Sequence, residues 1–126
     1  MSKIEKFEDL IVWQEARKLT QVIYQITKSG PFSKDFGLVN QIQRASVSVM
    51  SNIAEGFERA SAKQLFHFLA IAKGSCAELR SELYIAFDLG YLERQQFLEV
   101  FRKAESVAKL IGGLRMAVIN YQRRNN

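Results

Sequence analysis

The chain has 126 residues, of which 48% are hydrophobic and 25% charged, an ordinary soluble composition for one domain with a real core. No run approaches the roughly 18 apolar residues of a membrane span, and the charged amino terminus lacks the apolar segment of a signal peptide. The net charge of +5 points to an acidic partner such as RNA, DNA or a membrane surface, and the single Cys76 excludes an internal disulfide and suits a reducing, cytoplasmic location.

The first half of the chain carries two stretches with helical periodicity. Apolar residues at intervals of three and four predict a first helix over about 8–28. Gly30 and Pro31 then break the pattern, and Ser33 is the expected N-cap of a second helix. This second helix is predicted over about 34–57.

The second half of the chain carries two further helices. Gly56 is expected to end the second helix or to loosen its last turn. The segment Ser61–Gln64 has the form of a capping box and opens a third helix over about 61–89, which has a strict heptad seam. Gly90 is a natural residue to follow its end, and a fourth helix is predicted over about 93–121.

These four segments predict the fold class. Connections of only a few residues force neighbouring helices to run antiparallel, and no stretch alternates as a strand would. We therefore expect residues 1–126 to form a single all-α domain, an antiparallel up-down four-helix bundle.

A polar stripe runs along the second helix and faces a matching stripe on the third. Its members fall on one side of each helix at intervals of three and four, and they are Gln41, Arg44, Ser48, Asn52 and Glu55 on the second helix and Ser75 and Glu78 on the third. If the chain reverses near 56–60, Arg44 lies near Ser75 and Glu78, and Asn52 lies near His67. We expect a structural polar network with an Arg44–Glu78 contact under about 4 Å, within or between chains; the alternative is a ligand, metal or catalytic site.

Several kinds of catalytic site are excluded because the chain lacks the residues that they require. A di-iron bundle needs two Glu-x-x-His motifs, whereas the chain has one histidine, His67, with Gln64 at the position of the required glutamate. Cys76 lies on the heptad seam, where a thiol is usually a small core residue, and no glycine-rich phosphate loop is present. We expect no enzyme activity, no metal, no cofactor and no small-molecule substrate.

Gly112 and Gly113 lie inside the fourth predicted helix. Each costs up to about 1 kcal/mol relative to alanine, so a compensating contact is expected. We favour the close approach of another helix at a subunit interface; a kink or local fraying is the alternative.

The positive charge is concentrated on the fourth helix and the tail. Residues 93–126 hold seven basic and three acidic residues, a net charge of +4, against +1 for the rest of the chain. The candidate nucleic-acid-binding residues are these seven: Arg94, Arg102, Lys103, Lys109, Arg115, Arg123 and Arg124. The alternative is an ordinary solvated face; a membrane contact is disfavoured because the bundle needs the apolar face of this helix.

Three segments carry a family resemblance. FEDLIVWQEARKL at Phe7–Leu19, QIQRASVSVMSNIAEGF at Gln41–Phe57 and FLAIAKGSCAELRSEL at Phe68–Leu83 together resemble the four-helix bundle proteins of the 23S rRNA intervening-sequence family. The resemblance implies small bundles that assemble as ring-like homopentamers, some encoded inside insertions of bacterial large-subunit rRNA genes. Accessory proteins of diversity-generating retroelements, which resemble this family, are basic pentamers that bind nucleic acid and a reverse transcriptase. One departure is Met50, where such sequences commonly have proline.

The resemblance carries no catalytic residues over to this chain, and the family's motif positions coincide with the polar stripe. We therefore expect a homo-oligomeric bundle that binds nucleic acid, or scaffolds an RNA–protein complex, through the basic face of its fourth helix. The alternative is a protein-interacting assembly subunit without a nucleic-acid role.

Overall fold

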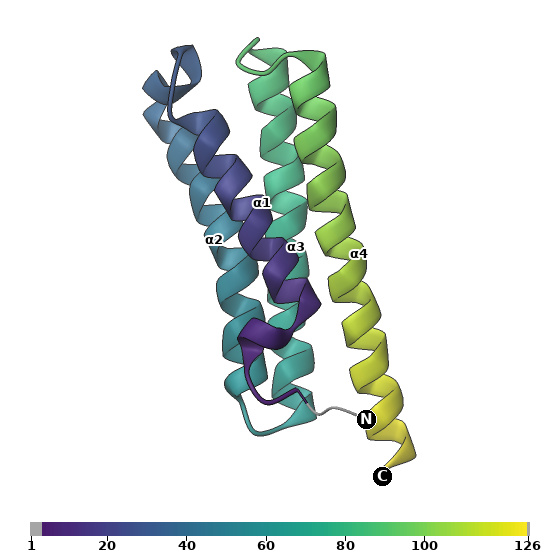
Figure 1. The fold of residues 1–126 in the computed structure, drawn as a ribbon. Coiled ribbons are helices and arrows are strands. Elements are labelled where there is room, and N and C mark those ends of the chain that lie inside the picture. The colour runs from purple at the N-terminus through teal and green to yellow at the C-terminus, as the bar shows by residue number, and fades with distance from the viewer. Residues whose placement is uncertain (1–3, 126) are drawn as a thin grey trace.

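The computed structural model describes residues 4–125 and consists almost entirely of four long helices (Figure 1). They are α1 (Ile11–Thr27), α2 (Phe36–Glu58), α3 (Ala62–Asp88) and α4 (Arg94–Arg124). α1 and α3 run in one direction while α2 and α4 run in the other, and short connections join them. The predicted all-α, antiparallel four-helix bundle is confirmed, and residues 4–125 contain no strand.

The amino-terminal ends of the first two helices differ from the prediction. Phe7–Asp9 form a short 3-10 turn instead of the start of α1, and Leu10 is extended. The N-cap of α2 is Asp35, whose Oδ1 accepts a hydrogen bond of 3.2 Å from the Leu38 N–H. The prediction that Ser33 caps this helix is wrong, because Ser33 lies in a separate 3-10 turn and donates its hydroxyl to the Gly30 carbonyl at 2.7 Å.

The junction between α2 and α3 also corrects the prediction. Ser61 is the N-cap of α3, with its hydroxyl accepting from the Gln64 N–H at 3.1 Å. Gly56 does not end α2, which continues to Glu58. Its role is close packing instead: a Cβ added to Gly56 would lie 2.8 Å from the Cβ of Phe68 on α3.

All four helices contribute to one apolar core. Its largest fully buried aliphatic side chains are Leu19, Ile23, Ile42, Ile53, Leu69, Leu79, Leu83 and Ile111. Burying each such side chain contributes roughly 1.5–3 kcal/mol before conformational entropy is counted, so the core holds the helices in place.

One end of the bundle is fastened by contacts between two connections. The ring of Phe32, in the α1–α2 connection, stacks on Tyr91, in the α3–α4 connection, with centroids 5.1 Å apart. The Tyr91 hydroxyl donates to Oδ2 of Asp35 at 3.0 Å. Asp35 therefore caps α2 and joins the two connections, which fixes the start of α4 relative to α2.

Candidate nucleic-acid interface

Six of the seven basic residues predicted as a nucleic-acid interface are exposed on α4. These are Arg94, Arg102, Lys103, Lys109, Arg123 and Arg124. Arg115 differs, because its guanidinium lies 4.1 Å from the centre of the Phe66 ring on α3 and its Nε is buried without a hydrogen-bond partner among residues 4–125. The structure thus places Arg115 in the α3–α4 contact, apart from the open face.

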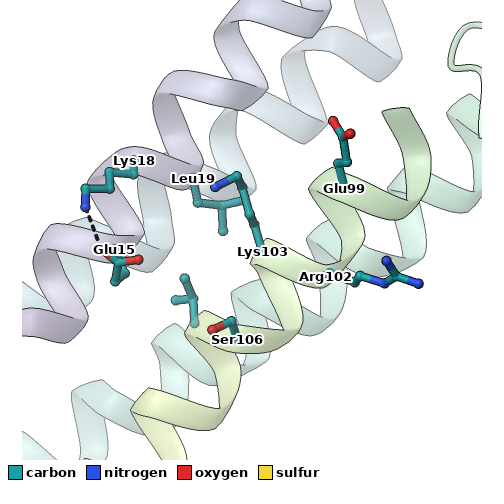
Figure 2. A pocket seen from close by; sticks show the side chains of 8 residues that line it. Glu15, Lys18, Leu19, Glu99, Arg102, Lys103 and Ser106 are labelled. Carbon is teal, nitrogen blue, oxygen red and sulfur yellow. Dashed lines mark ion pairs between the residues drawn. The ribbon is translucent and has the colours of Figure 1, made fainter. Parts of the chain in front are cut away.

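The exposed cations of α4 do not all share one side of the helix. Arg102 and Lys109 are seven residues apart and lie on the same side, whereas Lys103 is turned by about 100° from Arg102. Figure 2 shows the Lys103 side chain extending toward Leu19 of α1, while Arg102 points away from α1. Arg102 and Lys103 both line a groove beside α1, whereas Lys109 lines a groove beside α3.

The first groove lies between α1 and α4 and has a volume of about 450 Å³. Its lining residues are Glu15, Lys18, Leu19, Glu99, Arg102, Lys103, Ser106 and Val107 (Figure 2). The carboxylates of Glu15 and Glu99 offset part of the positive charge of Lys18, Arg102 and Lys103, and Glu15 forms an ion pair of 3.0 Å with Lys18.

The second groove lies between α3 and α4 and has a volume of about 190 Å³. Lys73 and Arg80 reach it from α3, and Lys109, Glu105, Ala108 and Gly112 line it from α4. Lys73 and Arg80 were missed by the sequence reasoning, although their seven-residue spacing on one helix face was a readable signal.

The basic residues of α4 lack carboxylate partners. The ion pairs within residues 4–125 are Lys18–Glu15 and Arg59–Glu55, each between residues three or four apart in the sequence. No carboxylate of the described chain lies within 4 Å of an α4 cation, and six of the seven α4 cations are exposed.

Some residues of the predicted polar network of α2 and α3 form hydrogen bonds, and the others do not. The hydroxyls of Ser48 and Ser75 lie 2.9 Å apart, and Asn52 donates to the Ser48 hydroxyl at 3.0 Å and to its carbonyl at 2.8 Å. Glu55 instead accepts from Arg59, the residue that follows α2, at 3.3 Å. Among these contacts, the Ser48–Ser75 pair joins the middle of α2 to the middle of α3.

Gln41, Arg44 and Glu78 remain exposed, and their side chains form no hydrogen bond or ion pair within residues 4–125. The predicted Arg44–Glu78 ion pair therefore does not form within the chain. The cause is the register: Ser75 faces Ser48, one helical turn along α2 from the Arg44 that the prediction placed opposite it.

The packing of α3 determines how far its titratable side chains are buried. Burial raises the pKa of Glu82 to about 6, and the neighbouring Glu78 raises it further. Cys76 is fully buried in the core, and this burial raises the pKa of its thiol to about 11. His67 is exposed and packs edge-on against Phe68 rather than against Asn52. Within residues 4–125 no three His, Cys, Asp or Glu side chains gather where they could hold a metal ion.

Within residues 4–125, no helix combines the length and the apolar character that crossing a bilayer requires.

Comparison with known proteins identifies a similar fold and a matching family. A crystal structure from Bacteroides thetaiotaomicron, described as a protein of unknown function from the S23 ribosomal protein family, superposes with a TM-score of 0.76. It is 21% identical, and the match covers 83% of this chain and 98% of that one, which supports the fold alone. A search of curated proteins found no significant match. The family model of the 23S rRNA-intervening sequence protein matches residues 8–113, and the chain therefore belongs to the 23S rRNA-intervening sequence protein family.

Proposed function

We propose that this protein is a nucleic-acid-binding bundle that contacts phosphates through the exposed cations of α4. The observation that carries the proposal is that six exposed basic residues follow one helix, and no carboxylate of residues 4–125 lies within 4 Å of them. A concentration of positive charge of this kind attracts a polyanion, and added salt weakens the resulting complex.

The proposed mechanism is largely independent of sequence. Arginine and lysine contact phosphate oxygens and release condensed counterions, while base edges play little part. Six of the seven α4 cations are exposed on a helix that the bundle core holds in place, so a nucleic acid can reach them without a change of fold. Such a protein would act as a scaffold that holds RNA, or RNA and protein together.

A salt titration tests this function. Fluorescence anisotropy with a labelled RNA should show binding at 50 mM salt that weakens steeply by 200 mM. Arg102→Glu together with Lys109→Glu should lose most of this affinity, while Lys28→Glu together with Lys34→Glu, a matched change on exposed residues near the α1–α2 connection, should lose much less. Absence of binding even at low salt would overturn the proposal.

The proposal contains no catalytic step. It is supported by the burial and raised pKa of the Cys76 thiol and by the exposed position of His67, which packs on Phe68 and not on a nucleophile. A cytoplasmic location, which a single reduced thiol suits, belongs to the same proposal. Metal analysis of the purified protein and assays for hydrolysis of bound RNA are the direct checks.

A second candidate function, a protein-interacting assembly subunit, is favoured by a separate observation. An apolar hollow of about 280 Å³ lies where the amino-terminal segment meets α4, lined by Ile4, Asp9, Leu10, Ile11, Val12, Leu110 and Leu114. Exposed apolar surface of this kind often marks a protein interface. Copies of the same chain are the proposed partner, in the homopentamer that the family resemblance implies.

A further inference from the structure

The α3–α4 groove differs from the α1–α4 groove in its charge. Three cations line it, Lys73, Arg80 and Lys109, against the single carboxylate of Glu105. None of the three is within 4 Å of a carboxylate of residues 4–125. The groove therefore concentrates positive charge from two helices.

Two of the three cations of this groove contact the helices around them. Arg80 is partly buried, and its Nε donates to the Cys76 carbonyl at 3.4 Å. The Nζ of Lys73 lies 3.7 Å from the point where a Cβ on Gly112 would sit, an ordinary van der Waals distance. The ammonium group of Lys73 therefore reaches across the groove to α4 beside Gly112.

An aromatic side chain lies on α3 one helical turn beyond Arg80. Tyr84 follows Arg80 by one helical turn, and its ring packs against Phe97 and Phe101 with centroids 5.1 and 5.2 Å away. The side chain is nevertheless 51% exposed. Tyr84 is thus packed against α4 and still partly open to solvent, one helical turn along α3 from Arg80.

We propose that the α3–α4 groove is a binding site for single-stranded nucleic acid, with phosphates at Lys73, Arg80 and Lys109 and a base stacked on Tyr84. The inference rests on the proposed function and adds α3 and a class of nucleic acid to it. Fixed aromatic rings combined with a cationic groove characterise single-strand binding, because an unpaired base exposes its flat face. In a duplex the bases are already stacked, so Tyr84 would contribute nothing.

The charge experiment uses Lys73→Gln together with Arg80→Gln, which removes both charges and leaves shorter polar side chains. The matched control is Lys28→Gln together with Lys34→Gln. Anisotropy is measured with labelled 20-nucleotide single strands of DNA and of RNA, and with a duplex of equal length. The groove variant should bind both single strands at least ten-fold more weakly, with a salt slope smaller by about 1.4, since each lost phosphate contact removes about 0.7.

The stacking experiment uses Tyr84→Leu, with Tyr24→Leu as its control because Tyr24 is similarly exposed on α1. Tyr84→Leu should weaken single-strand binding about five-fold or more and leave duplex binding unchanged. Circular dichroism confirms that each variant is folded. If the double groove variant does not fold, Lys73→Gln alone, at an exposed ammonium, should still weaken binding and reduce the slope by about 0.7.

The outcomes separate the two proposals. If the wild-type chain binds neither single strands nor duplex, the proposed function fails together with this inference. If it binds, but the groove variant and its control weaken binding equally, only this inference fails. Equal effects of Tyr84→Leu on single strands and duplex would overturn the assignment to single strands.

Discussion

At the scale of single residues, the Ser48–Ser75 contact is the polar link between α2 and α3. The two hydroxyls are 2.9 Å apart, and Ser75 is only 7% exposed. A partly buried hydroxyl that loses its partner keeps its desolvation cost, so Ser75→Ala should lower the free energy of unfolding by about 0.5–1.5 kcal/mol.

A double-mutant cycle with Ser48→Ala measures this link by urea unfolding. The two substitutions should be coupled by at least about 0.5 kcal/mol, whereas exposed Ser81→Ala on the same helix should not couple to Ser48→Ala. Strict additivity of the two changes would show that the hydroxyls do not stabilise each other.

The carboxyl of Glu82 predicts a dependence of stability on pH. Its pKa rises from 4.5 to about 6 through burial and then through Glu78, so the folded chain holds this proton more tightly than the unfolded chain. The favourable contribution is complete below pH 4.5 and is lost as the pH rises through 6. Because the group is partly solvated, the loss should be about 1 kcal/mol rather than the full value of the shift.

Glu82→Gln removes this titration. The variant should equal the wild type in urea unfolding at pH 4.5 and exceed it by about 1 kcal/mol at pH 7. Glu99→Gln, at an exposed position on α4, serves as the control and should show no such change. A stability difference for Glu82→Gln that is the same at both pH values would contradict the role of burial.

At the scale of helices, replacing glycine with alanine should change the stability of the protein in opposite directions at two positions. A Cβ at Gly56 would lie 2.8 Å from Phe68 and 3.2 Å from Leu65, so Gly56→Ala forces α2 and α3 apart and should cost about 1–3 kcal/mol. At Gly113 no atom of residues 4–125 outside the local helix lies within 4 Å of the added methyl. Gly113→Ala should therefore gain about 0.5–1 kcal/mol through helix propensity. Thermal unfolding followed by circular dichroism measures the change in stability of each variant. If both substitutions stabilise the protein, or both destabilise it, this account is contradicted.

The same glycines show how far sequence reasoning reaches at this scale. Periodicity located all four helices within a few residues of their ends, because each helix buries one apolar stripe. The sequence alone does not distinguish a glycine that ends a helix from one that lets a neighbouring helix come close, so the expectation that Gly56 ends α2 was wrong. With the turn placed too early, the register of α2 against α3 moved by one helical turn, and Arg44 took the place of Ser48 opposite Ser75.

At the scale of the whole molecule, the excess of positive charge in residues 93–126 could be predicted by counting residues. The distribution of these charges over the surface of the bundle could not. Whether a cation on α4 faces α1, α3 or open solvent depends on how α4 is rotated in the bundle. Arg115 lies over Phe66 for this reason, and Lys103 extends toward α1. Lys73 and Arg80 join the basic surface only because α3 packs beside α4. The candidate interface is therefore a product of tertiary packing, while the fold class follows from local pattern.

The last prediction concerns assembly of the whole molecule. Ile11 is 67% exposed beside the apolar hollow of the amino-terminal segment and α4, whereas Phe36 is 73% exposed at the start of α2 and lines none of the hollows described above. If copies of the chain bury this hollow, light scattering should give a mass that is a multiple of 14.4 kDa, five-fold by family resemblance. Ile11→Asp places a charge in the buried contact and should reduce the mass toward one chain, while Phe36→Asp should leave it unchanged. A monomeric wild type would refute assembly and leave nucleic-acid binding standing, and equal masses for both variants would move the interface away from this hollow.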